Sequence, residues 1–140
     1  QIYFYDPFVK NLNGKINDLE QLAKLVDIIF ICCELNSSTK NLINKNIISK
    51  LKQNSLIINT SRGELVDEEE MIKAIEKEKV YYATDVICDE LNPSKFKTSK
   101  LLNFNHRSDR ILITPHIGGA SKDAMQLTEE FISQKLCSYY

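Results

Sequence analysis

Three residues in the sequence have side chains that could together bind a carboxylate and exchange a proton with a carbonyl group. Arg62, Glu90 and His116 each follow the end of an apolar run. The planar guanidinium of an arginine binds a carboxylate through two parallel hydrogen bonds. A glutamate beside a histidine stabilises the imidazolium ion, so the pair can act as a general acid–base couple between a carbonyl and an alcohol.

Each of these residues also has an ordinary structural interpretation. Arg62 could form a structural salt bridge, His116 could bond to the backbone of its own turn, and Glu90 could be one surface carboxylate among many. The chemical interpretation is favoured if separate strands bring the three side chains to one edge of a sheet.

Apolar and amphipathic segments alternate along the chain, which is typical of an α/β protein with a doubly wound, mostly parallel sheet. We expect strands over residues 1–5, 26–33, 55–59, 80–87 and 110–114, with residues 15–16 as a minimal strand. We expect a short helix capped by Asn17, a helical segment over 39–52 that breaks near 44–46, and helices over 67–77 and 121–137. Residues 91–109 are expected to form a polar loop with one helical turn near 99–103. The apolar residues of the last helix are expected to face inward: Ala124, Leu127, Phe131 and Leu136.

In such a sheet the crossovers are right-handed, so the carboxyl ends of the strands share one edge, where ligands bind. Arg62, Glu90 and His116 would meet there. Asp6 closes the first run and would lie at the same edge. An acid in that place can accept a hydrogen bond from the ribose 2′-OH of NAD and would repel the 2′-phosphate of NADP. Many strands also end in aspartate simply because it favours a turn.

The composition argues against several classes of protein. A net charge of −1 gives no basic surface for nucleic acid or an acidic membrane. No apolar run reaches the roughly 18 residues that a membrane span needs, and no secretory leader is visible. The four cysteines form no CxxC pair and only two histidines are present. This favours reduced, buried thiols in a cytoplasmic protein over a zinc site, so no metal is expected.

Four segments resemble the NAD-binding domain of the D-isomer-specific 2-hydroxyacid dehydrogenases. They are LVDIIFICCELNSSTKNLIN (25–44), SLIINTSRGELVDEEEMIKAI (55–75), ATDVICDE (83–90) and ILITPHIGGAS (111–121). The resemblance runs from Tyr3 to about Leu136, and the NTSRG and TPHIGG motifs are specific in combination. The His-Ile-Gly-Gly form resembles the phosphoglycerate dehydrogenase branch more than the lactate or formate branches.

The resemblance implies a catalytic role for each of the three residues. Arg62 would bind the carboxylate and carbonyl of the substrate. Glu90, five residues after Asp85 as in the family, would pair with His116. His116 would donate a proton to the carbonyl oxygen during reduction and accept it during oxidation.

The resemblance also implies a set of contacts with NAD. Asp85 would hold the nicotinamide carboxamide and Asp6 the adenosine ribose, while Cys33 would touch the cofactor through its backbone. The remaining contacts would line the nicotinamide side and come from two turns: Thr60, Ser61 and Arg62 in one, His116, Gly118 and Gly119 in the other. A homodimer through the nucleotide-binding domain is expected as well.

The sequence departs from the family pattern at three places. It has no G-x-G-x-x-G loop, because its only glycines are Gly14, Gly63, Gly118 and Gly119. Glu34 stands where the family usually has proline, and the segment 6–26 is short. We therefore expect residues 1–140 to be a partial, Rossmann-type NAD-binding domain that lacks the first strand. It would be the C-terminal part of a longer two-domain enzyme, with the substrate domain largely absent. The alternative is a short protein that re-pairs its sheet or exchanges elements with a partner.

The leading functional hypothesis is NAD-dependent hydride transfer between a D-2-hydroxy acid and its 2-oxo acid, with 3-phosphoglycerate as one candidate substrate. A second hypothesis is an NAD-sensing binding protein that resembles the family's corepressors, and a third is a catalytically inert fragment. A receiver-like signalling domain is disfavoured, because it needs a lysine at a late strand end where this chain has Pro115-His116.

Overall fold

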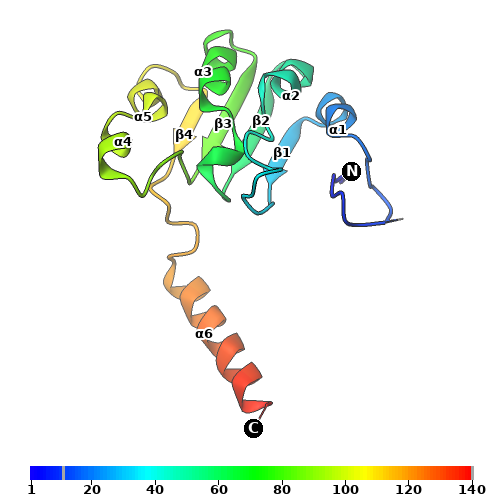
Figure 1. Ribbon diagram of the computed structural model, residues 1–140, viewed down its shortest axis with the longest axis vertical. Helices are drawn as coiled ribbons and strands as arrows, with labels where there is room; N and C mark the ends of the chain where they lie inside the picture. Colours follow the sequence, from blue (N-terminus) through cyan, green and yellow to red (C-terminus); the bar gives the residue numbers. More distant parts are fainter. Residues whose placement is uncertain (11, 140) are drawn as a thin grey trace.

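The computed structural model describes residues 1–10 and 12–139, and its centre is a parallel sheet of four strands. The strands are β1 (Ile28–Ile31), β2 (Ser55–Asn59), β3 (Val80–Thr84) and β4 (Ile111–Ile113). They lie side by side in sequence order (Figure 1). The predicted Rossmann-type α/β architecture is thereby confirmed. The predicted strand 55–59 is confirmed in full, whereas the other three are shorter than expected.

One row of side chains crosses the whole sheet and forms the centre of the core. Ile29 is paired with Ile57, Ile57 with Tyr82, and Tyr82 with Ile111. All of them are buried, and Ile57 and Tyr82 have exposed fractions of 0% and 1%. The nearly continuous apolar runs of the sequence therefore bury their side chains mainly on one face of the sheet.

The connecting helices cover that face. They are α1 (Leu19–Leu25), α2 (Lys45–Lys50), α3 (Glu68–Glu76) and α5 (Lys100–Asn105). Figure 1 shows them along one side of the sheet. Right-handed crossovers between strands in sequence order place every connection on the same side. The strand residues that point the other way include Ile28, Phe30 and Leu112, which are exposed.

The predicted strand 1–5 is wrong. Phe4 forms only an isolated bridge with Lys15, closed by hydrogen bonds from Phe4 N to Gly14 O and from Ile16 N to Phe4 O. A groove of about 650 Å³ separates this segment from β1 and is lined by Tyr3 and Phe30 among others. A strand needs a partner to complete its hydrogen bonds, and β1 lies too far away to be one. The predicted minimal strand 15–16 is accordingly reduced to this bridge.

Polar caps set the helix boundaries. Asp18, not Asn17, caps α1, by accepting a hydrogen bond from the N–H of Glu20 at 2.9 Å. Asn44 caps α2 by accepting from the N–H groups of Asn46 and Ile47, so the break predicted near 44–46 is confirmed, but only the second half of the predicted helical segment 39–52 is a helix. Asp67 caps α3 as predicted.

The predicted polar loop 91–109 contains two helices. Asn92 caps α4 (Pro93–Lys97), where Pro93 occupies the first turn, and Ser99 caps α5. Leu101 and Phe104 of α5 are buried in the core. The helical turn predicted near 99–103 is therefore confirmed as α5, whereas α4 was not predicted, although Asn92 followed by Pro93 favours a helix start.

The last helix, α6 (Lys122–Cys137), was predicted to turn its apolar residues toward the core, and this prediction is wrong. Leu127, Phe131 and Leu136 are 66%, 59% and 57% exposed, and only Ala124 is half-buried. Figure 1 shows α6 extending away from the rest of the molecule. Among the described residues, no helix is long and apolar enough to cross a membrane.

Candidate active site

The turn that carries Arg62 is fixed by the buried side chain of Asn59, the last residue of β2. Its Nδ2 donates to the carbonyl oxygen of Arg62 at 2.9 Å, and its Oδ1 accepts from the N–H of Ser61 at 3.1 Å. Ser61 Oγ donates to the carbonyl oxygen of Ile31 at 2.8 Å, which ties the turn to β1. The backbone is thus held, and the exposed guanidinium of Arg62 donates to the carbonyl oxygen of Ser61 at 2.6 Å.

Gly63 allows this turn to touch the segment that follows β3. A Cβ at Gly63 would overlap the backbone of Ile87 and Cys88. The absence of a side chain therefore permits a close approach of two backbones, which brings the Arg62 turn next to the loop that carries Glu90.

Two glutamates that the sequence analysis did not select hold the same loop. Glu68 accepts a hydrogen bond from the N–H of Cys88 at 2.7 Å, and Glu64 accepts one from the N–H of Asp89 at 3.1 Å. Burial raises the pKa of the Glu68 carboxyl, although the bond from Cys88 acts against it. Glu68 lies in the first turn of α3 and Glu64 in the short turn before it, so no local pattern in the sequence indicates these long-range bonds.

His116 and Glu90 form the pair that their types predicted. His116 Nδ1 lies 2.7 Å from Glu90 Oε1, and the other carboxylate oxygen accepts from the N–H of Ile87 at 3.4 Å. The backbone of His116 has φ of 54°, in the left-handed region that histidine adopts more readily than most residues. Because the glutamate engages Nδ1, the other ring nitrogen is the one available to exchange a proton with a substrate.

Asp85, directly after β3, holds the turn in which His116 lies. Its carboxylate accepts hydrogen bonds from Thr114 Oγ1, from the N–H of Ile117 at 3.0 Å and from the N–H of Gly118 at 2.7 Å. Burial alone would raise the pKa of this carboxyl, but the hydrogen bonds outweigh burial and the pKa lies below its ordinary value. Most of the hydrogen-bonding capacity of Asp85 is therefore used within the chain.

The three predicted catalytic residues line one cleft of about 760 Å³. Arg62 comes from the turn after β2, Glu90 from the loop after β3 and His116 from the turn after β4. A second hollow of about 350 Å³ adjoins the His116–Glu90 pair and is largely apolar, with Phe96, Leu102 and Ile113 in its wall. The convergence inferred from parallel topology is present, whereas the catalytic roles stay predictions.

The sequence and the fold both have close counterparts. Residues 1–118 match the family described as "D-isomer specific 2-hydroxyacid dehydrogenase, NAD binding domain". This chain belongs to that family.

Among its relatives is the D-3-phosphoglycerate dehydrogenase of Escherichia coli K12, 35% identical over 144 residues, which cover 99% of this chain and 34% of the relative. The hydroxypyruvate reductase of Thermotoga maritima is 32% identical over 128 residues, which cover 90% of this chain and 40% of the relative. The D-lactate dehydrogenase of Aquifex aeolicus, solved with NAD and lactic acid, superposes with a TM-score of 0.75 at 26% identity. The superposition covers 96% of this chain and 44% of the Aquifex aeolicus chain. This member of the family thus spans less than half the length of these relatives.

Within this dehydrogenase-family domain, the predicted cofactor residues fall into two groups. Cys33 follows β1, Thr60 and Ser61 follow β2, and the two glycines of the His116 turn follow β4, so all lie at the carboxyl edge. Asp6 follows none of these strands. It lies in the N-terminal segment, outside the sheet, where it accepts a hydrogen bond from the N–H of Phe8 at 2.8 Å.

The described residues therefore fit one end of NAD and not the other. The nicotinamide end would meet the turns after β2 and β4, beside Arg62 and His116. A pyrophosphate needs backbone N–H groups at a glycine-rich helix start, and the chain contains no G-x-G-x-x-G.

The four cysteines are free thiols. Cys32 and Cys137 are exposed, so the prediction of buried thiols is wrong for these two. Cys32 lies at the open edge and Cys137 on the protruding α6. Burial raises the pKa of Cys88 and of Cys33, which lowers the reactivity of both thiols. Over residues 1–10 and 12–139, no cluster of potential metal ligands is found.

Proposed function

We propose that residues 1–140 are the C-terminal part of the NAD-binding domain of a D-2-hydroxyacid dehydrogenase, and that the domain contributes the catalytic residues of that enzyme. The reaction would interconvert a D-2-hydroxy acid and its 2-oxo acid, with 3-phosphoglycerate as one candidate. The observation that carries this proposal is the 2.7 Å contact between His116 and Glu90 at the cleft that Arg62 also lines.

Each residue has a defined task in this proposal. Arg62 binds the substrate carboxylate through its guanidinium and orients the adjacent carbonyl. Glu90 stabilises the imidazolium form of His116. His116 then donates its proton to the carbonyl oxygen during reduction and takes it back during oxidation. NAD, when bound, supplies or accepts the hydride.

The catalytic assignment is tested in the complete natural protein with His116→Gln. The rate of 2-oxo acid reduction is measured from the decrease in NADH absorbance. We expect kcat to fall about 10²–10⁴-fold while the NADH dissociation constant changes little. His106→Gln is the matched control, since His106 closes α5 and does not line the cleft.

Two outcomes would contradict the proposal. Normal turnover of the His116→Gln protein would exclude His116 as the proton donor. Binding of NADH without turnover of any 2-oxo acid by the unmodified protein would instead support the NAD-sensing alternative.

A further inference from the structure

The hollow of about 350 Å³ beside the His116–Glu90 pair has walls that the proposed proton transfer does not use. Phe96 comes from α4, Leu102 from α5 and Ile113 from β4, and the surface is largely apolar. We call this cavity the apolar hollow. An apolar cavity of about 150 Å³ is already large enough to bind benzene. The apolar hollow therefore has room for an aliphatic or aromatic group of several carbon atoms.

The walls of the apolar hollow differ in how firmly they are held. On the α5 side, Leu101 and Phe104 are buried in the core and fix the helix. Figure 1 shows α4 and α5 next to one another on the β4 side of the sheet. The side formed by α4 and the loop before it leaves apolar surface open, because Phe96 is 43% exposed and Leu91 is 93% exposed. An apolar group in the hollow would remove part of this surface from water, which favours its binding.

The charges around the apolar hollow disfavour an anionic group inside it. Among the described residues that line it, none is a lysine or an arginine, whereas Asp85 and Glu90 are carboxylates. Asp85 accepts its hydrogen bonds from the chain, and Glu90 is paired with His116. Lys95 of α4 is paired with Asp89 at 3.0 Å and does not line the hollow. A phosphate group would therefore meet like charges and no guanidinium or ammonium group to bind it.

The order of groups along a 2-oxo acid matches the order of the two cavities. The cleft and the apolar hollow share Glu90, Leu91 and His116, whereas Arg62 lines only the cleft. The carboxylate and the side chain of a 2-oxo acid are attached to different sides of the carbonyl carbon. With the carboxylate at Arg62 and the carbonyl oxygen at His116, the side chain therefore extends away from Arg62. The apolar hollow adjoins His116 and can receive it there.

We propose that the apolar hollow receives the side chain of the substrate, so that the enzyme acts on 2-oxo acids with a branched aliphatic or aromatic side chain in preference to phosphorylated ones. This inference rests on the proposed catalytic function and narrows its substrate class. Phe96 and Leu102 then determine specificity and are not catalytic, because they contact the side chain of the substrate and not its carbonyl group.

The test compares three 2-oxo acids as substrates of the complete natural protein, each with NADH. They are 4-methyl-2-oxopentanoate, whose side chain is branched and apolar, glyoxylate, which has no side chain, and 3-phosphohydroxypyruvate, whose side chain carries a phosphate. We expect kcat/KM for 4-methyl-2-oxopentanoate to exceed each of the other two values by at least about tenfold, because one methylene group in an apolar pocket already contributes about tenfold or more.

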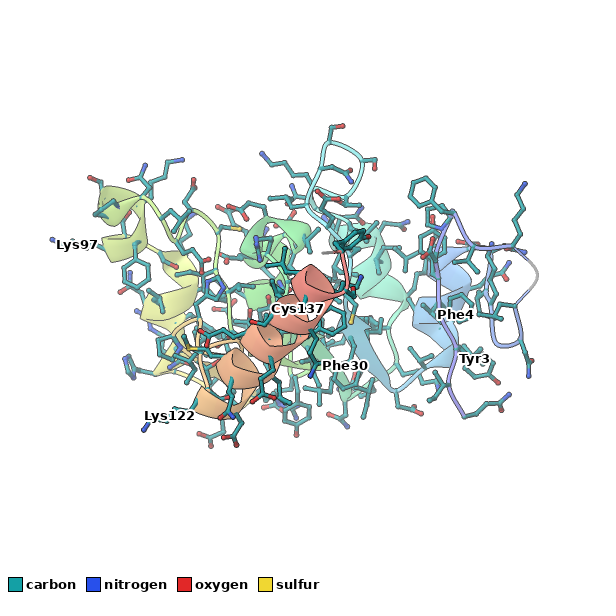
Figure 2. The ribbon with its side chains drawn as sticks, turned by 90° about the horizontal axis from the view of Figure 1, so that it is seen from below. Tyr3, Phe4, Phe30, Lys97, Lys122 and Cys137 are labelled. Atoms are coloured by element: carbon teal, nitrogen blue, oxygen red, sulfur yellow. The ribbon has the colours of Figure 1, made fainter. Side chains whose placement is uncertain are left out.

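Two substitutions of Phe96, which lines the apolar hollow and not the cleft, test the hollow itself. Phe96→Ala removes apolar wall and should lower kcat/KM for 4-methyl-2-oxopentanoate about tenfold, while the value for glyoxylate changes less than about twofold. Phe96→Arg adds a cation and should raise kcat/KM for 3-phosphohydroxypyruvate. Lys97→Ala should change none of the three values, since Lys97 ends α4 without lining the hollow and Figure 2 shows it at the margin of the molecule.

Three results would each overturn this inference while leaving the catalytic proposal intact. The first is turnover of the three acids with equal kcat/KM or with a preference for the phosphorylated one. The second is an unchanged preference in both Phe96 variants. The third is a rise in the NADH dissociation constant that matches the loss of kcat/KM, which would assign the hollow to the cofactor. Turnover of none of the three acids would instead overturn the proposed function, and the inference with it.

Discussion

The carboxyl edge of β2, β3 and β4 and the N-terminal segment 1–16 are held together in different ways. At the edge, buried or half-buried side chains bind backbone groups of neighbouring segments, as Asn59, Asp85 and Glu68 do. The N-terminal segment has a bridge between Phe4 and Lys15 and local turns. The His116–Glu90 pair is therefore positioned without a hydrogen bond from the N-terminal segment. Asp6, the predicted cofactor contact in that segment, is held only by a local hydrogen bond from the N–H of Phe8.

The largest effect is expected from Gly63→Ala. The added methyl group would overlap the backbone of Ile87 and Cys88, which cannot move aside as a flexible side chain could. We expect the free energy of unfolding, measured with urea, to fall by about 3–5 kcal/mol. Gly119→Ala is the control, since a Cβ there meets nothing within 4 Å. Equal stability of the two variants would show that the edge is looser than its bonds suggest.

A smaller loss is expected from Asn59→Ala. The change leaves the N–H of Ser61 and the carbonyl oxygen of Arg62 without their buried partner. We expect a loss of about 2–3 kcal/mol in the free energy of unfolding. A loss below about 0.5 kcal/mol would mean that water replaces the amide and that the Arg62 turn is not rigidly fixed.

Lowering the pH should reduce the stability of the folded chain, because it protonates Asp85 at the carboxyl edge. Its pKa in the folded chain lies below the ordinary value, so the unfolded chain binds the proton more readily. The stabilisation is complete above the unfolded pKa of about 3.9 and is lost as the pH falls through the folded pKa. We expect the urea midpoint to fall from pH 6 to pH 3, and less steeply in Asp85→Asn. Identical pH profiles would contradict the role given to this carboxylate.

The smallest effect is expected from Asp6→Ala in the N-terminal segment. This change removes only the local bond from the N–H of Phe8. We expect the free energy of unfolding to change by less than about 0.5 kcal/mol. A loss comparable to that of Asn59→Ala would end the contrast between the two regions.

The sequence predicted what local signals determine. Residues 55–59 form a strand and Asp67 caps α3 because an apolar run and a capping residue act within a few positions. The meeting of Arg62, Glu90 and His116 followed from parallel topology, which sends every strand's carboxyl end to one edge.

The rest depended on contacts between distant segments. Residues 1–5 have the composition of a strand, but a strand also needs a neighbour with free backbone groups, and composition does not reveal one. The pattern of α6 shows that the helix has an apolar side and not which surface will cover it. Glu68 has an ordinary helix-start position, so its bond to Cys88 was invisible before the fold was known.

The carboxylate of Asp85 has a consequence that reaches beyond the stability of one turn. It binds Ile117 and Gly118, which lie between the imidazole of His116 and the first turn of α6. The position of the His116 ring and the direction of α6 therefore share a single anchor. Any event that neutralises this carboxylate would release the His116 turn and the start of α6 at the same time. In acid, the position of the ring and the direction of the helix should therefore change together.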